Sequence, residues 1–187
     1  MSEAALDYLR MPLDSFLKAV ASGEPAPAGG SAAAAVVALA AGLVCKSARL
    51  STQHLPGAAG LAEQAEGLMK GVVPLVREDA AAYAEVLAAR REGREMEEAL
   101  SGAADVPLAI AEAGEEVARI ATLLAAEGKP ALRGDAQVAA LLAGAASQAA
   151  ALLAGINLRA AGVRDGRLRR VEELAGEKRR RQREREK

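Results

Sequence analysis

The chain has 187 residues and a formal net charge of −1, with 51% hydrophobic and 26% charged residues. This length suits one domain with its own hydrophobic core, and the balance of residues is ordinary for a soluble globular protein. Only 2% of the residues are aromatic. Because alanine and leucine dominate the apolar residues, and residues that favour strands are scarce, we predict an all-α protein.

Composition also excludes several kinds of site. A single cysteine, Cys45, rules out an internal disulfide and agrees with a reducing cytoplasm. One cysteine and one histidine, His54, cannot build a metal site with several such ligands, so we expect no metal. The uncharged run of residues 25–45 holds only about 15 helical residues before Lys46, whereas a membrane span needs about 20, and the first ten residues lack a signal-peptide apolar segment. We therefore expect a soluble cytoplasmic protein without a membrane partner.

The N-terminal part of the chain predicts two helices. Apolar residues recur at the spacing of an amphipathic helix over residues 13–20. Two prolines then hold the chain extended, and a second helix follows over about residues 30–53, with Ser31 as its N-cap. Because this second helix is apolar on all sides until Cys45, we expect it at the centre of the fold.

A third helical pattern covers residues 61–91 and is bent at Pro74. Its apolar stripe continues through Asp79 and Tyr83, so a carboxylate falls inside the stripe. A charged residue in a buried stripe must be paired, protonated or functional, and burial raises the pKa of a carboxyl toward the range useful for proton transfer. The alternative is that the stripe drifts to Ala80 and leaves Asp79 at a solvated edge.

The C-terminal half predicts two further long helices. Pro107 opens one over residues 106–126, and Asp135 is placed as the N-cap of another that ends near Arg159. The apolar stripe that we expect to be buried on the last helix consists of Val138, Leu141, Ala145, Gln148, Leu152 and Ile156. Long helices with short connections favour a bundle of five to seven helices over residues 1–163.

Residues 164–187 are rich in both basic and acidic side chains. The basic residues outnumber the acidic ones, eleven to six, and such an excess of positive charge can bind nucleic acid. The acids are interspersed among the bases, however, and no aromatic side chain is present to stack on nucleotide bases. We therefore expect a charged, solvated helix or frayed tail, and no nucleic-acid partner.

Two further polar features are candidate binding groups. The consecutive glycines Gly29 and Gly30 leave the amides of a helix start uncovered, which favours an anion or a polar ligand atom. The alternative is a tight turn that allows close helix packing. Lys46 and Arg49 are three residues apart and share a helical face, so together they could bind a carboxylate. The alternative for this pair is a surface position or a helix cap.

Four segments, taken together, resemble the formiminotransferase-cyclodeaminase C-terminal domain family, also called the cyclodeaminase/cyclohydrolase family. They are FLKAVASGEPAPAGGSAAA at 16–34, EDAAAYAEVL at 78–87, DVPLAIAE at 105–112, and GDAQVAALLAGAASQAAALLAGINL at 134–158. The resemblance implies an all-α domain that assembles as a homodimer and acts on one-carbon tetrahydrofolates. Members of the family convert 5-formiminotetrahydrofolate to 5,10-methenyltetrahydrofolate with release of ammonia, or hydrolyse the methenyl compound to 10-formyltetrahydrofolate.

The function implied by this resemblance is that of a folate-dependent cyclodeaminase or methenyltetrahydrofolate cyclohydrolase, with Asp79 as the proton-transfer group. A tetrahydrofolate derivative is the expected substrate, and we expect no permanently bound cofactor. The alternative is a non-catalytic helical dimer that retains the family fold, with or without folate binding. The expected substrate-binding residues are Gly29, Gly30, Ser31, Lys46, Arg49, Tyr83, Asp135 and Asn157.

Overall fold

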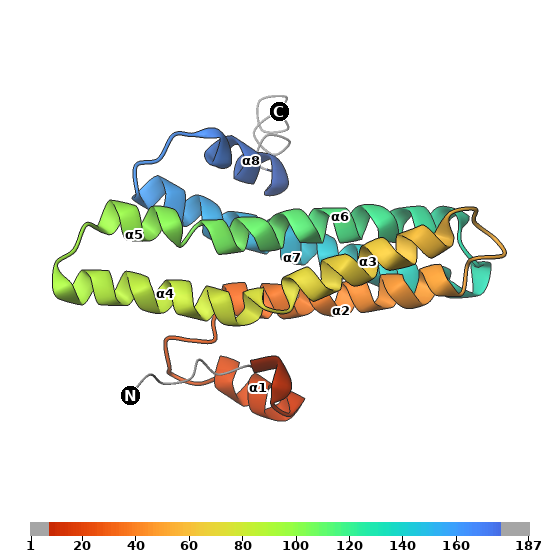
Figure 1. Ribbon diagram of the computed structural model, residues 1–187, viewed down its shortest axis with the longest axis horizontal. Helices are drawn as coiled ribbons and strands as arrows, with labels where there is room; N and C mark the ends of the chain where they lie inside the picture. The colour runs from red at the N-terminus through yellow and green to blue at the C-terminus, as the bar shows by residue number, and fades with distance from the viewer. Residues whose placement is uncertain (1–7, 177–187) are drawn as a thin grey trace, which may run out of the picture.

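The computed structural model describes residues 8–176, and every regular element within them is helical (Figure 1). Two short 3-10 turns are η1 (Tyr8–Arg10) and η2 (Pro130–Leu132). The α-helices are α1 (Leu13–Val20), α2 (Gly29–Arg49), α3 (Ala58–Val72), α4 (Leu75–Glu92), α5 (Met96–Gly102), α6 (Asp105–Glu127), α7 (Arg133–Ala160) and α8 (Gly166–Leu174). The all-α prediction is confirmed. Six of these helices, α2 to α7, form the bundle, and α1 and α8 lie outside it (Figure 1).

Prolines and glycines set several helix boundaries. The third predicted helix is divided into α3 and α4, because Pro74 lacks an amide hydrogen and stands as the N-cap of α4. Pro107 lies in the first turn of α6, where a missing amide hydrogen costs no helical hydrogen bond. The helix α2 begins at Gly29, so the prediction of Ser31 as its N-cap is wrong: Ser31 is the third residue of the helix.

The helix α2 lies at the centre of the bundle, as predicted. Val37 and Val44 have no exposed surface, and α3, α6 and α7 all pack against this helix. Figure 1 shows α6 and α7 side by side along the length of the bundle. At Gly114 of α6, a methyl group would lie 3.0 Å from the Cβ of Ser147 on α7. Glycine at this position therefore permits the close approach of the two helices.

Two segments of the described chain, Gly29–Arg49 and Pro130–Ala160, are long and apolar enough to cross a membrane by length and composition alone. In α2, 61% of the most apolar window is buried inside the bundle. Core helices of soluble proteins pass the same test, so the central position of α2 accounts for its composition. In the second segment the buried share is 44%, so much of the apolar surface of α7 faces outward.

The prediction of the buried face of α7 is wrong. Leu141 is 74% exposed and Ile156 is 52% exposed, and Gln148 also lies on this outer face. A face of small residues is buried instead, because small side chains let α7 approach α2 and α6 closely. The buried residues of this face are Ala136, Ala139, Ala143, Ala146, Ser147, Ala150, Ala151, Ala154, Gly155 and Leu158.

The helix α8 belongs to the packed unit, so the predicted boundary after residue 163 does not separate two independent parts. Val171 and Leu174 are buried, and the Arg170 guanidinium forms ion pairs of 3.2 and 2.6 Å with Glu112 and Glu115 of α6. The predicted charged helix is present at Gly166–Leu174, but it is packed against the bundle and not solvated or frayed. Residues 177–187, with the rest of the predicted tail, lie outside the described residues.

Candidate active site

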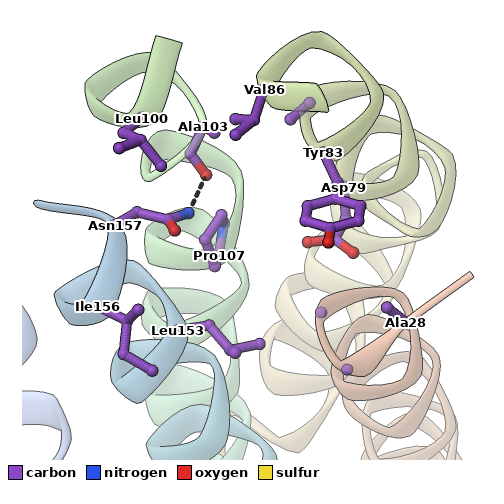
Figure 2. Close-up of a pocket in the computed structure, with 13 residues that line it drawn as sticks. Ala28, Asp79, Tyr83, Val86, Leu100, Ala103, Pro107, Leu153, Ile156 and Asn157 are labelled. Carbon is purple, nitrogen blue, oxygen red and sulfur yellow. Dashed lines mark hydrogen bonds between the residues drawn. The ribbon is translucent and has the colours of Figure 1, made fainter. Parts of the chain in front are cut away.

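A cavity of about 320 Å³ lies at one end of the bundle, above the N-terminus of α2 (Figure 2). The helix α4 forms one wall, and α5, α6 and α7 form the wall opposite. The lining residues are Ala28, Gly29, Gly30, Asp79, Ala82, Tyr83, Val86, Leu100, Ala103, Pro107, Leu153, Ile156 and Asn157. Apart from Asp79, Tyr83 and Asn157, these residues offer only apolar side chains or bare backbone.

Asp79 is held against the start of α2 by Ser31. The Ser31 hydroxyl donates a hydrogen bond to Asp79 Oδ2 at 3.0 Å, and the backbone N–H of Ser31 also donates to this carboxylate. Ser31 has no exposed surface, so its hydroxyl depends on Asp79 for a partner. The carboxylate thus occupies the place of a cap at the N-terminus of α2, although it comes from another helix.

Gly30 explains why α2 begins without side chains. A methyl group on Gly30 would lie 1.9 Å from Asp79 Oδ1, well inside van der Waals contact. The carboxylate therefore packs directly on the Cα of this glycine. The sequence predicted that the bare helix start leaves room for a polar ligand atom, and the structure places the Asp79 side chain in that room.

The environment of Asp79 raises its pKa above the ordinary value for aspartate. Burial among helices raises the pKa because it disfavours the charged carboxylate, and the hydrogen bonds from Ser31 offset part of this rise. A carboxyl with a raised pKa retains its proton closer to neutral pH, so it can donate that proton to a leaving group and accept one in return.

Tyr83 and Asn157 lie across the cavity from each other. Tyr83 stands one turn after Asp79 on α4 and is 45% exposed (Figure 2). On the opposite wall, the Asn157 amide nitrogen donates a hydrogen bond to the Ala103 carbonyl at 3.1 Å (Figure 2). This bond fixes the amide and leaves Asn157 Oδ1 without a donor among the described residues. The site therefore offers an aromatic ring on one side and a hydrogen-bond acceptor on the other.

Three predicted binding residues lie elsewhere. Lys46 is 16 residues after Gly30 on α2, a separation of about 24 Å along the helix axis. Its ammonium group forms an ion pair of 2.7 Å with Asp135, which is in the first turn of α7 and is not the predicted N-cap. Arg49 pairs with Glu66 at 2.5 Å. None of these residues lines the cavity, so we leave Lys46, Arg49 and Asp135 out of the candidate site.

Sequence reasoning missed the apolar walls of the cavity. Leu100, Leu153 and Pro107 line it, but nothing in their spacing distinguishes them from core residues. Ile156 was predicted to be buried and instead stands at the rim, 52% exposed. Within residues 8–176 no group of three or more His, Cys, Asp or Glu side chains could hold a metal ion.

Comparisons with known proteins agree with this geometry. A family model described as formiminotransferase-cyclodeaminase matches residues 12–172. The chain belongs to this family. The match covers the whole bundle and most of α8, and so includes every residue that lines the cavity.

Two proteins of known name are similar to this chain. Methenyltetrahydrofolate cyclohydrolase from Methylorubrum extorquens is 31% identical over 148 residues, which cover 70% of this chain and 71% of the relative. The crystal structure of formiminotetrahydrofolate cyclodeaminase from Thermotoga maritima superposes with a TM-score of 0.78 at 28% sequence identity. That match covers 90% of this chain and 88% of the other.

Proposed function

We propose that this protein is a folate-dependent one-carbon enzyme, a formiminotetrahydrofolate cyclodeaminase or a methenyltetrahydrofolate cyclohydrolase. The observation that carries the proposal is a carboxyl group of raised pKa, Asp79, fixed by Ser31 at the edge of an open, largely apolar cavity. The names of the two relatives support a folate substrate.

The proposed chemistry uses Asp79 as a proton carrier. In ring closure, nitrogen 10 of the folate attacks the formimino carbon and loses its proton, and the departing nitrogen must be protonated to leave as ammonia. A neutral Asp79 supplies that proton, and the resulting carboxylate then accepts one in return. In the hydrolytic reaction, the carboxylate instead takes a proton from the water that attacks the methenyl carbon. The bond between this carbon and nitrogen 5 then breaks, and nitrogen 5 receives the proton as the 10-formyl compound forms. The substrate carries the reacting groups, so no bound cofactor is required.

The other polar groups of the cavity are proposed to orient the substrate. The Tyr83 ring and the apolar wall of Leu153 and Pro107 suit the faces of the fused pterin rings, whose polar atoms lie at their edges. Asn157 Oδ1 is placed to accept a hydrogen bond from a pterin N–H group. Binding depends on shape and a few directed hydrogen bonds, as in most small-molecule sites.

The test is a paired assay of the purified protein with 5-formiminotetrahydrofolate and 5,10-methenyltetrahydrofolate. Formation or loss of the methenyl compound is followed by its absorbance, and ammonia release is measured in parallel. Turnover of either substrate supports the proposal and identifies the reaction. The absence of turnover with both, at protein concentrations comparable to that of substrate, contradicts it.

The alternative is a non-catalytic helical protein that keeps the family fold. One observation favours it: the hydrogen bonds between Asp79 and Ser31 also tie α4 to α2, so the carboxylate has a structural role even without a substrate. Calorimetry with the same folates separates the two ideas. Binding of folate without turnover favours the alternative.

We further infer that two copies of the chain associate through the outer face of α7. Between residues 136 and 157 this helix has no charged side chain, and Leu141 is 74% exposed. An uncharged apolar face of this length marks an association surface. Gln148 lies near the middle of the face, so a twofold axis there would let two glutamine amides hydrogen-bond to each other. Ile156 belongs to both the face and the cavity rim, so the second copy would lie close to the site.

Leu141→Glu is expected to convert the dimer to a monomer, because it buries an unpaired charge within an apolar interface. Sedimentation velocity of the wild-type and variant proteins measures the change. Val73→Glu is the matched control, since Val73 is 40% exposed at the junction of α3 and α4, outside this face, and the variant should remain dimeric. A monomeric wild-type protein, or one that instead sediments with lipid vesicles, contradicts the proposed dimer.

A further inference from the structure

The cavity leaves one part of the proposed substrate without a partner. Among the residues that line it, Asp79 is the only acidic residue, and none is Lys, Arg or His. A folate ends in glutamate, whose carboxylates are charged at neutral pH. These carboxylates gain nothing from an apolar cavity beside another carboxylate, so the tail must extend out of it toward cations.

A second groove lies next to the cavity and shares Tyr83 with it. It has a volume of about 570 Å³ and runs between α4 and the segment of residues 24–26 that precedes α2. Tyr83 lines both the cavity and this groove. A ligand that leaves the cavity over the Tyr83 ring therefore enters the groove directly.

The groove combines an apolar floor with two cations at one end. Pro25 and Leu87 contribute apolar surface, and Arg90 and Arg91 line the groove from the last turn of α4. Neither of these guanidinium groups forms an ion pair or hydrogen bond with another described residue. By contrast, Arg94 is paired with Glu92 at 2.7 Å.

The ordinary role of these charges at a helix C-terminus does not account for the groove. Basic residues in the last turn of a helix interact favourably with the helix dipole, but this effect needs no adjoining hollow. Glu24 also lines the groove and adds one negative charge. Two guanidinium groups against one carboxylate still leave a local excess of one positive charge.

We infer that this groove binds the glutamate tail of the folate substrate, with its carboxylates held by Arg90 and Arg91. The inference rests on the proposed function. Arg90 is 11 residues after Asp79, about 16 Å along α4. The p-aminobenzoyl ring and the glutamate extend in line from the one-carbon unit, so the ring passes over Tyr83 and the apolar floor before the carboxylates reach the arginines. Planar guanidinium groups bind carboxylates through paired hydrogen bonds.

The test compares the wild-type protein with the double variant Arg90→Gln and Arg91→Gln on whichever folate the wild-type protein turns over in the paired assay, prepared with one glutamate or with four. The wild-type protein should have the lower KM for the longer tail. The double variant should raise that KM about tenfold or more, as expected for lost hydrogen bonds to charged groups. Its kcat should stay within about twofold, because Asp79 is untouched. Arg77→Gln is the matched control, since Arg77 is exposed on the same helix and lines neither the cavity nor the groove.

The outcomes separate this inference from the proposed function. If the wild-type protein turns over folates and the double variant keeps the same KM for both tail lengths, the groove does not bind the tail, although the activity stands. If the wild-type protein turns over neither substrate, calorimetry with pteroyltetraglutamate replaces the kinetics. Weaker binding by the double variant then supports the groove. Equal binding, or no binding by the wild-type protein, overturns it.

Discussion

Asp79→Asn is expected to lower kcat for the folate substrate by about 10²–10⁴-fold, the usual contribution of a general acid or base. The amide has nearly the shape of the carboxyl group and can still accept a hydrogen bond from Ser31, so the fold should be kept. It can neither donate a proton to the leaving nitrogen nor accept one from water. Steady-state kinetics, together with the circular dichroism of the variant, measure both effects.

The same variant is expected to change how stability depends on pH. Burial raises the pKa of Asp79 in the folded protein, whereas in the unfolded chain the pKa is about 3.9. The folded state therefore holds this proton more tightly, and the wild-type protein loses stability as pH rises from about 4 through the raised pKa. Asp79→Asn has no charge to bury, so it should gain stability relative to the wild-type protein across this range. Thermal melts at a series of pH values give the comparison.

Glu78→Gln is the matched control for both measurements. Glu78 is the preceding residue on α4, is exposed and does not line the cavity, so the variant should retain activity and show little change in stability. Full activity in Asp79→Asn would remove Asp79 from the proposed chemistry. Loss of activity accompanied by unfolding would instead assign Asp79 to the structural link between α4 and α2.

The sequence located Asp79 on the correct helical face but could not say what that face meets. Both interpretations of the stripe proved partly correct, because the buried side of α4 runs through Val76 and Ala80 while Asp79 and Tyr83 face the cavity beside it. The contact with Gly30 joins positions 49 residues apart in the sequence. No local spacing encodes such a contact, so the sequence alone could not explain the glycine.

Lys46 and Asp135 show a different failure. Their residue types suited a binding site, and both lie on helices that reach the cavity. Helix geometry places Lys46 about 24 Å from Gly30, however, so a helix that starts near the site carries its last turn to the far end of the bundle. The position of Lys46 could be predicted from the sequence, because the start of α2 was predicted to within two residues.

The packing of α7 and α8 was misjudged for a physical reason that both helices share. Periodicity identifies the larger apolar side chains, such as Leu141, but a close-packed helix can bury its alanine face instead. In α8 the many charges obscured Val171 and Leu174, which are three residues apart and share a buried face. Its arginines are not merely solvated, since Arg170 pairs with acids on α6.

Gly30→Ala is expected to reduce activity by about 100-fold through the displacement of Asp79. The added methyl group would lie 1.9 Å from Asp79 Oδ1, so the carboxylate must move by more than 1 Å, and a displacement of this size can cost about 10²-fold in rate. The move also breaks the hydrogen bond from the buried Ser31 hydroxyl, which should lower the free energy of unfolding by about 1–3 kcal/mol. Kinetics and chemical denaturation measure these two effects.

Two variants decide whether the effect of Gly30→Ala runs through Asp79. Gly42→Ala, on the same helix, places its methyl group 3.9 Å from Met69 Sδ and should leave activity unchanged while stabilising the helix by up to about 1 kcal/mol. In an Asp79→Ala background the clash is absent, so Gly30→Ala should then cost almost no stability. If Gly30→Ala lowers the free energy of unfolding equally in both backgrounds, Gly30 is required only by the backbone conformation of α2. If the loss of stability disappears in the Asp79→Ala background, glycine is required at position 30 because the Asp79 carboxylate occupies the space that a side chain would fill.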